Sequence, residues 1–277
     1  MTKSFSKKYD LSKKNAIITG SCGLLGIEHS IALLELGAKV VMTDIDPAAY
    51  EKICNRFEGY KGSVSFYEMD ITSAESIIAV RDDLRQKGTE IDILINNAAI
   101  NPKFDSQFKL NISRVENYDL DLWNKELAVG LTGPLLCSKY FGQKMAENSK
   151  GGVILNIASD LSVISPDNRL YKKNDLVDNQ QFVKPISYSV IKHGLIGMTK
   201  YISTYWASKN IRCNALSPGG VFTDHDDEFV KRISQLIPMG RMAERDEYRA
   251  AVQFLCSDAS SYMNGQNIIM DGGRSVW

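Results

Sequence analysis

Short apolar runs alternate with longer amphipathic stretches along the whole sequence. Asn15–Thr19 and residues 39–43 are almost continuously apolar, which is typical of strands buried on both faces of a sheet. Residues 25–36 between them have helical periodicity, and Gly37 is well placed to end that helix. The alternation predicts a parallel α/β sheet, doubly wound with helices on both faces. Further strands are predicted at 63–69, 91–95, 152–157, 212–216 and 267–270, and further helices from Pro47 and at 73–86, 119–129, 135–147, 188–208 and 244–255.

Two connections are long for a compact domain, residues 101–118 and residues 166–186. Loops of more than about 12–15 residues are usually functional or disordered. Both follow predicted strands, and loops at the carboxyl ends of strands border the ligand crevice of a doubly wound sheet. We therefore expect them to be walls of a substrate site. No repeat and no Pro-, Gly- or Ser-rich linker divides the sequence, so residues 1–277 are predicted to be a single domain.

Composition narrows the possible partners. The 33 basic and 33 acidic residues cancel, which gives no general reason to expect nucleic acid or an anionic membrane. Five widely spaced cysteines without CxxC spacing, and three scattered histidines, suggest neither disulfides nor a metal site. The first 14 residues are polar and basic without an apolar segment, unlike a secretory signal. We predict a cytoplasmic protein that acts on a small molecule.

A glycine-rich turn, TGSCGLLG at residues 19–26, joins the first predicted strand to the first helix. Glycine permits a tight turn, and the positive helix N-terminus can hold a pyrophosphate that the backbone approaches closely. A tight turn without a ligand would also use glycine, so the position between strand and helix carries the inference. The expected cofactor contacts in this turn are Thr19, Gly20, Ser21, Gly23, Leu24, Leu25 and Gly26.

Asp44 ends the second predicted strand, 18 residues after Gly26. A carboxylate there can accept hydrogen bonds from the adenine-ribose hydroxyls and would repel a 2′-phosphate. The glycine turn contains no Arg or Lys to receive such a phosphate, so NAD is favoured over NADP as the cofactor. Alternatively, Asp44 caps the following helix, which Asp46 could do equally well.

Tyr188 and Lys192 lie four residues apart on a predicted helix and so share one face. A phenol with a pKa near 10 would need about 4 kcal/mol of preferential stabilisation of its phenolate to act as a base at neutral pH. A nearby ammonium and a positively charged nicotinamide ring can supply this where water is excluded. Tyr188 could then exchange a proton with a substrate hydroxyl as a hydride moves.

Six ordered motifs resemble those of the short-chain dehydrogenases/reductases: TGSCGLLG, Asp70-Ile71, Asn96-Asn97-Ala98-Ala99, Tyr188-Ser-Val-Ile-Lys192, Ser217-Pro218-Gly219 and Gly265-Gln266 with Asp271-Gly272-Gly273. The resemblance covers residues 13–273. It implies a Rossmann sheet of order 3-2-1-4-5-6-7 and roles for Tyr188 and Lys192 in both catalysis and cofactor binding. The further cofactor residues that it implies are Ile45, Asp70, Ile71, Asn97, Ala98, Ala99, Pro218, Gly219, Val221 and Thr223.

The resemblance also points to a catalytic serine that orients the substrate oxygen. Ser159 best fits the end of its strand, with Ser162 and Ser165 as rivals. It precedes Tyr188 by 29 residues, against about a dozen in the family, so residues 166–185 look like an insertion. Gly130 stands where the family has an asparagine that helps to anchor a proton-relay water. Residues 221–243 resemble the family's substrate lid.

The substrate is the least specified part of the prediction. Residues 187–221 resemble oxidoreductases of bacterial surface-sugar and flagellin-modification pathways, which suggests carbohydrate modification. Candidate substrate contacts are Asn101, Arg169 and His225. The alternatives are a 3-oxoacyl thioester reductase, which Asp44 disfavours, and a weakly active NAD-binding redox sensor or scaffold, which Gly130 would suit. A homodimer or homotetramer is expected, with Trp277 at a subunit interface.

Overall fold

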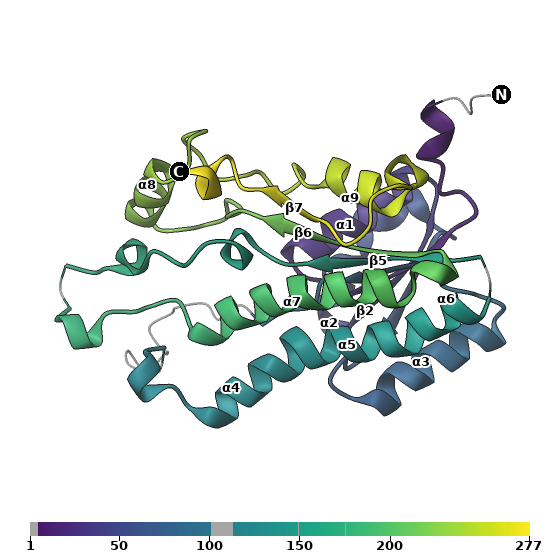
Figure 1. Cartoon of the computed structure of the whole chain (residues 1–277), viewed down its shortest axis with the longest axis horizontal. Coiled ribbons are helices and arrows are strands. Elements are labelled where there is room, and N and C mark those ends of the chain that lie inside the picture. Colours follow the sequence, from purple (N-terminus) through teal and green to yellow (C-terminus); the bar gives the residue numbers. More distant parts are fainter. Residues whose placement is uncertain (1–4, 101–112, 149, 175) are drawn as a thin grey trace.

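The computed structural model describes residues 5–100, 113–148, 150–174 and 176–277. In this part of the chain, seven parallel strands form one sheet in the order β3-β2-β1-β4-β5-β6-β7 (Figure 1). The predicted α/β class and strand order are therefore confirmed. The strands are β1 (Asn15–Thr19), β2 (Lys39–Asp44), β3 (Val64–Glu68), β4 (Ile93–Asn96), β5 (Gly152–Ile157), β6 (Ile211–Pro218) and β7 (Asn267–Met270).

Alternating side chains of β1 pack against different helices. Ala16 and Ile18 belong to a hydrophobic cluster with α1 (Leu24–Glu35) and α9 (Arg249–Cys256). Ile17 belongs to a second cluster on the opposite face of the sheet. Because both faces of the central strand are buried, an apolar run without polar alternation is the sequence that this position requires.

The second cluster is covered by α3 (Ala74–Gln86), by the helical stretch of residues 120–147 and by α7 (Ile186–Tyr205). Figure 1 shows these helices along one side of the sheet and α1 and α9 along the other. Two further α-helices lie in the described chain, α2 (Pro47–Glu51) after β2 and α8 (Asp227–Gln235) after β6. None of the helices in the described segments is long and apolar enough to cross a membrane.

Residues 120–147 differ from the prediction because they form one continuous helical stretch and not two helices. It consists of α4 (Leu120–Leu127), α5 (Gly133–Cys137) and α6 (Gln143–Glu147), joined by π-helical turns at Ala128–Thr132 and Ser138–Gly142. Pro134 explains the expected break, since proline clashes with the carbonyl of residue i−4 in a regular helix. The wider π-helical turn before it, closed from Gly133 N to Ala128 O, lets the helix continue past the proline.

The region after β6 also differs from the prediction. The helix expected at 244–255 begins only at Arg249. The predicted lid, residues 221–243, contains a helix, α8, that is not predicted from the sequence. The first turn of α8 is acidic. Asp226 caps this helix by accepting a hydrogen bond from Phe229 N, and such acidic first turns favour a helix N-terminus. The two ends of the lid are joined, since Phe222 N donates to Ala243 O at 2.8 Å.

Candidate active site

The turn between β1 and α1 leaves no room for side chains at two glycines. Gly20 has a φ of 59°, and a Cβ there would lie 2.6 Å from Cα of Ala98. A Cβ on Gly26 would collide with the carbonyl oxygen of Gly20 and lie 2.7 Å from Cα of Ser21. The turn is therefore a backbone cradle at a helix N-terminus, where the first amide groups lack helical partners. This geometry fits a bound pyrophosphate.

Three of the predicted cofactor residues use their side chains to hold this turn from within. Thr19 Oγ1 accepts hydrogen bonds from the backbone amides of Asn97 (3.0 Å) and Ala98 (3.1 Å). Asn97 Nδ2 donates to the carbonyl oxygens of Thr19 and Gly20, both at 2.9 Å. Ser21 Oγ donates to Thr43 O at 3.2 Å. The end of β4 is thus tied to the glycine turn, which keeps the cradle rigid.

Asp44 lies at the rim of the turn. Its carboxylate accepts hydrogen bonds from the amides of Cys22 (3.1 Å) and Asp46 (3.3 Å). The following helix is capped by Asp46, which accepts from Ala48 N, so Asp44 is not needed as a cap. Burial raises the pKa of the Cys22 thiol to about 12, and the Asp44 charge adds to the effect. A negative charge is therefore fixed where the adenine ribose is expected.

The predicted pair Asp70 and Ile71 follows β3. The carboxylate of Asp70 accepts hydrogen bonds from the amide and hydroxyl of Thr72 at 2.8 and 2.7 Å. Ile71 is buried and fills the space over Gly133, where a Cβ would lie 2.6 Å from its Cδ1. Asp70 is thus held by its own loop, while Ile71 packs this loop onto α5.

A row of buried amides connects the sheet to α7. Asn96 Nδ2 donates to Asn156 Oδ1 at 2.8 Å, and Asn156 Nδ2 donates to Thr199 Oγ1 at 2.8 Å. Within the described chain, Asn96 Oδ1 is buried without a hydrogen-bond partner. Such unsatisfied buried atoms are rare in folded proteins. The two hydrogen bonds of Asn156 join β4, β5 and α7 and so fix their positions relative to one another.

The structure brings Tyr188, Lys192 and Ser159 together. Lys192 Nζ lies 5.6 Å from the centroid of the Tyr188 ring and donates to Ile157 O at 2.9 Å. Burial raises the pKa of Tyr188, a hydrogen bond with Ser159 lowers it, and the Asp160 charge raises it again. The chain alone thus keeps the phenol protonated, and phenolate formation needs the added positive charge of a bound nicotinamide.

The two rival serines lie elsewhere. Ser162 Oγ is 2.9 Å from Ser217 Oγ, which donates to Asn267 Oδ1, so Ser162 belongs to a buried polar group between β6 and β7. Ser165 is exposed. Of the three serines, only Ser159 has its hydroxyl at Tyr188, which supports the choice made from its strand-end position.

A buried ion pair supports Ser159. Its hydroxyl donates to Asp160 Oδ1 at 2.8 Å, and Asp160 Oδ2 accepts from Arg274 Nη1 at 2.7 Å. The side chains of Asp160 and Arg274 are only 5% and 8% exposed. A buried carboxylate is strongly destabilising without its partner, so Arg274 secures the loop that carries Ser159.

A second lysine contacts the same tyrosine ring. Lys184 Nζ lies 3.9 Å from the centroid of Tyr188, nearer than Lys192 Nζ. Burial lowers the pKa of Lys184 to about 8, while the Asp160 and Glu126 charges raise it. Burial and the neighbouring Lys184 charge lower the pKa of Lys192 to about 8 as well. Two lysines in a low-dielectric site thus repel each other across one phenol ring.

Gly130 is explained by packing against α7. A Cβ at this position would lie 2.6 Å from Cγ2 and 2.8 Å from Cδ1 of Ile191, the neighbour of Lys192. Ile191 is buried, so the space that a side chain at position 130 would occupy is already filled. An asparagine would require repacking of Ile191.

The insertion at 166–185 and the lid at 221–243 pack together as one cap. Leu170 of the insertion is buried in a small cluster with Ile233, Ile237 and Met242 of the lid. Tyr171 contacts Phe229 with ring centroids 5.8 Å apart. Trp277 is 76% exposed, and its indole donates to Leu236 O at 3.1 Å. The cap is therefore joined to the C-terminal segment that carries Arg274.

The three predicted substrate residues are not gathered at Tyr188 in the described structure. Arg169 is 85% exposed and paired with Asp167 at 2.6 Å. His225 stacks on Phe229 and accepts a hydrogen bond from Thr223 N at 3.2 Å, so it orders the start of the lid. Asn101 lies outside the described residues. The ion pair with Asp167 holds Arg169 at the surface. The residue of the insertion that contacts Tyr188 is Lys184.

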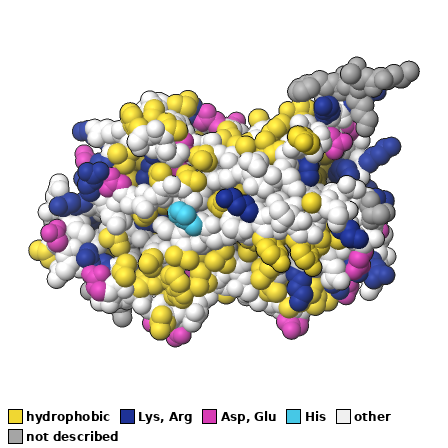
Figure 2. Space-filling model, viewed as in Figure 1, with side chains coloured by type: hydrophobic (Ala, Val, Ile, Leu, Met, Phe, Trp, Pro, Cys, Tyr) yellow, Lys and Arg dark blue, Asp and Glu magenta, His cyan; other side chains and the backbone are white. Residues whose placement is uncertain are grey.

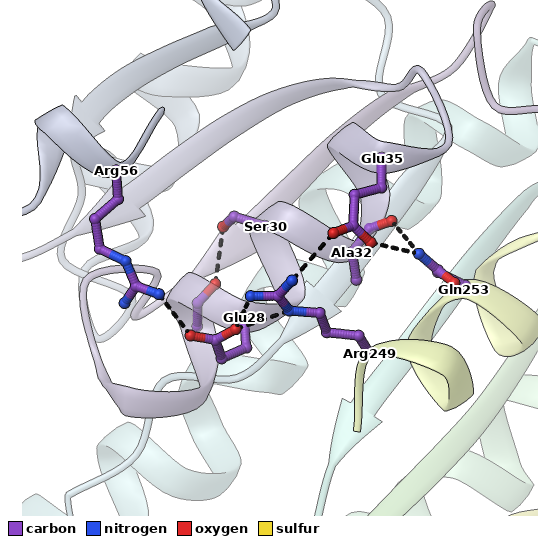
Figure 3. Close-up of polar contacts among 8 residues, drawn as sticks. Glu28, Ser30, Ala32, Glu35, Arg56, Arg249 and Gln253 are labelled. Carbon is purple, nitrogen blue, oxygen red and sulfur yellow. Dashed lines mark hydrogen bonds and ion pairs between the residues drawn. The ribbon is translucent and has the colours of Figure 1, made fainter. Parts of the chain in front are cut away.

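A charged cleft of about 420 Å³ borders the lid on the α1 side. Thr223, a predicted cofactor residue, lines it together with Glu28, Arg56 and Arg249. Glu28 is only 2% exposed and is paired with both arginines, and Figure 3 shows it between them. Arg249 also reaches Glu35 at 3.0 Å. These ion pairs fasten α9 to α1 and so fix the base of the lid.

Sequence reasoning missed Lys184, Asp160, Arg274 and Glu126. Lys184 precedes Tyr188 by four residues, the same spacing as from Tyr188 to Lys192, which was the one available signal. Asp160 directly follows Ser159, but its partner Arg274 is 114 residues away in sequence. Glu126 is buried and accepts hydrogen bonds from Tyr118 and Ser187, with Oε1 unpartnered among the described residues.

Comparisons with known proteins agree with this geometry. Residues 14–171 match the family model described as short chain dehydrogenase, and residues 176–275 match one described as enoyl-(acyl carrier protein) reductase. D-threitol dehydrogenase of Mycolicibacterium smegmatis is 28% identical over 273 residues, covering 97% of this chain and 95% of that protein.

Two solved structures are similar over almost their whole length. A short-chain dehydrogenase of Leptospira borgpetersenii with bound NAD⁺ is 29% identical, with a TM-score of 0.83 and coverage of 99% of this chain and 97% of that one. A gluconate 5-dehydrogenase of Burkholderia cenocepacia, in complex with NADP and tartrate, is 25% identical, with a TM-score of 0.83 and coverage of 99% and 100%.

Proposed function

The chain belongs to the short-chain dehydrogenase/reductase family and is an oxidoreductase of that family, and we propose that it interconverts a secondary alcohol and a ketone on a sugar-derived substrate with NAD(H). The convergence of Tyr188, Lys192 and Ser159 carries this proposal. D-threitol and gluconate, named for two relatives, are both polyhydroxylated molecules with secondary alcohols.

The cofactor would lie across the glycine turn, with its pyrophosphate at the N-terminus of α1 and its adenine ribose at Asp44. The tight backbone turn shaped by Gly20 and Gly26 and the carboxylate at its rim fit a dinucleotide. When bound, the nicotinamide ring accepts or supplies the hydride. Asp44 favours NAD, although one similar structure holds NADP.

Tyr188 is the proposed general base of the oxidation. Its phenolate takes the proton of the substrate hydroxyl as the carbinol C–H bond breaks, and its phenol returns that proton in the reverse direction. Ser159 orients the substrate oxygen, because Asp160 and Arg274 hold its hydroxyl in place. Lys192, fixed by Ile157 O, stabilises the phenolate and lies where it can hold the nicotinamide ribose.

We further propose that the protein is a cytoplasmic homo-oligomer whose residues 1–277 act as one domain. Figure 2 shows hydrophobic side chains gathered over the helical stretch of residues 120–147 and α7. Large apolar residues exposed on these helices are Leu135 (52%), Tyr201 (67%) and Tyr205 (62%). Exposed apolar patches of this kind mark association surfaces.

The test combines substrate screening with Tyr188→Phe. We expect NADH formation from NAD⁺ with at least one polyol or sugar acid, and a fall in kcat of about 10²–10⁴-fold in the variant, whose NAD⁺ affinity is measured in parallel. Tight NAD⁺ binding without turnover on any such substrate, in either direction, would instead favour the redox-sensor alternative.

A further inference from the structure

We propose that Asp160 is a positioning residue that holds the proton of the Ser159 hydroxyl away from the substrate oxygen, so that the site favours an alcohol over the matching ketone. This inference rests on the proposed dehydrogenase function and deepens it, because it assigns which member of the substrate pair the site binds better. The two residues are neighbours just after β5, where Ser159 caps the 3₁₀ turn of residues 160–162.

The direction of the Ser159 proton follows from the neighbours of its hydroxyl. The oxygen accepts a hydrogen bond from Leu161 N at 3.2 Å and lies 2.8 Å from Asp160 Oδ1. Asp160 forms a buried ion pair with Arg274, and an ionised carboxylate accepts hydrogen bonds but cannot donate one. The proton between Ser159 and Asp160 therefore belongs to Ser159 and points at the carboxylate.

This arrangement is enclosed and anchored. The serine, the carboxylate and the guanidinium are all buried, so solvent is kept from the serine proton. Arg274 is fixed because Asp271 accepts hydrogen bonds from Gly273 N at 2.9 Å and Ser275 N at 2.8 Å, on either side of it. A hydrogen bond to a charged group is roughly twice as strong as one between neutral groups. A neutral ketone oxygen is therefore the weaker competitor for the serine proton.

The resulting donors and acceptors match a hydroxyl group. Burial raises the pKa of Tyr188, so the phenol is protonated and supplies one donor. Ser159, whose proton is held by Asp160, supplies one acceptor, since Leu161 N occupies only one of its two lone pairs. An alcohol oxygen can accept from the phenol and donate to Ser159, whereas a ketone oxygen has no proton to donate. The ketone would leave Ser159 without its second partner, and an unpaired buried polar group lowers affinity.

The first experiment compares two double variants that both remove the charges of the ion pair. Asp160→Asn/Arg274→Met keeps an acceptor for the Ser159 proton, and Asp160→Leu/Arg274→Met removes it. The probes are D-threitol and erythrulose, the ketone formed when the secondary alcohol of threitol is oxidised. D-threitol is bound with NADH and erythrulose with NAD⁺, so that neither complex reacts. Calorimetry gives the two dissociation constants for each variant and for wild type.

We expect the ratio of ketone affinity to alcohol affinity to be about tenfold higher in the variant with Asp160→Leu than in wild type or the variant with Asp160→Asn. The reason is that the released serine proton can then reach the ketone oxygen. With Ser159→Ala added, the two double variants should give the same ratio, which a general loss of packing would not produce. Equal ratios in the two variants that retain Ser159 overturn the inference but leave the dehydrogenase proposal intact.

A second measurement needs no substrate. The ionisation of Tyr188 is followed in the NAD⁺ complex by NMR of protein labelled with ¹³Cζ-tyrosine, and the signal is assigned by its absence in Tyr188→Phe. A hydrogen bond with Ser159 lowers the pKa of Tyr188, and Ser159 can donate it only when its proton leaves Asp160.

The ionisation constant of Tyr188 should therefore be about tenfold greater with Asp160→Leu/Arg274→Met than with Asp160→Asn/Arg274→Met. Equal ionisation constants in the two variants overturn the inference even if neither D-threitol nor erythrulose binds. Failure of NAD⁺ itself to bind to wild type counts against the proposed function instead.

Discussion

The cofactor half of the candidate active site is made of backbone, whereas the substrate half is made of charged side chains. In the cofactor half, formed by β1–β4, Gly20 and Gly26 shape the cradle and Asn97 ties it to β4. In the substrate half, formed by β5–β7 and the cap, Lys184 and the Asp160–Arg274 pair surround Tyr188. On the proposed function, a nucleotide would be bound by backbone geometry that tolerates little substitution, and a substrate beside charged side chains that are paired with one another.

The largest effect is expected from the ion pair of the substrate half. Arg274→Met should lower the free energy of unfolding by about 3–5 kcal/mol, because Asp160 is left as an unpaired buried charge. Denaturant unfolding measures this. The double variant Asp160→Asn/Arg274→Met should recover much of the loss. If Arg274→Met costs less than about 1 kcal/mol, the substrate half does not depend on this pair.

In the cofactor half, Gly26→Ala tests whether the backbone cradle is as tight as its geometry indicates. The added methyl group collides with Gly20 O and lies 2.9 Å from Asn97 Nδ2. Overpacking of this kind costs about 1–3 kcal/mol, and we expect NAD⁺ affinity to fall about tenfold. Gly59→Ala is the matched control, because a Cβ there meets nothing within 4 Å. Unchanged affinity in Gly26→Ala would remove the contrast between the two halves.

The one charge expected to act in the cofactor half is Asp44. Asp44→Asn keeps an acceptor for Cys22 N but removes the charge that would repel a 2′-phosphate. The ratio of NADP⁺ to NAD⁺ affinities should rise about tenfold. Asp46→Asn loses the same charge nearby and retains a good helix cap, so it should leave the ratio unchanged. If both variants changed this affinity ratio equally, the preference would come from the overall negative charge of the region and not from Asp44.

The smallest expected effect concerns stability and pH. Burial lowers the pKa of Lys184 from 10.5 to about 8, so between these values the unfolded chain binds more protons and stability rises with pH. Below pH 8 the charged lysine is a full cost. Lys184→Met should therefore raise Tm by about 2–4 °C at pH 7, with the difference fading as the pH approaches about 10.5. A lower Tm at pH 7 would mean that Glu126 and Asp160 more than compensate its burial.

The same contrast determines what could be predicted from the sequence. Strands such as Asn15–Thr19, Gly152–Ile157 and Asn267–Met270 were placed to the residue, because each is a short run rich in apolar residues. The glycine turn was found because backbone geometry forces the choice of residue locally. The Asp160–Arg274 pair was not found, since its partners meet only through the fold.

Two of the differences in the helices also have physical causes. Separate helices are predicted on either side of Pro134, but a π-helical turn at Ala128–Thr132 lets one helical stretch continue past this proline. Residues 221–243 are predicted only as a lid, although the acidic residues Asp226–Glu228 favour the start of a helix there. In both cases the helix boundaries depend on tertiary packing and not on the local sequence alone. The proposed roles of the site residues remain predictions.

The strand order also has a consequence for biosynthesis. β1 lies between β2 and β4, and each later strand adds outside the one before it, β5 on β4, β6 on β5 and β7 on β6. The first 96 residues therefore contain every strand of the cofactor half. Since domains tend to form from the N-terminus during synthesis, we expect the nucleotide cradle to take shape on the nascent chain. The Asp160–Arg274 pair of the substrate half can form only after the ribosome has added residue 274.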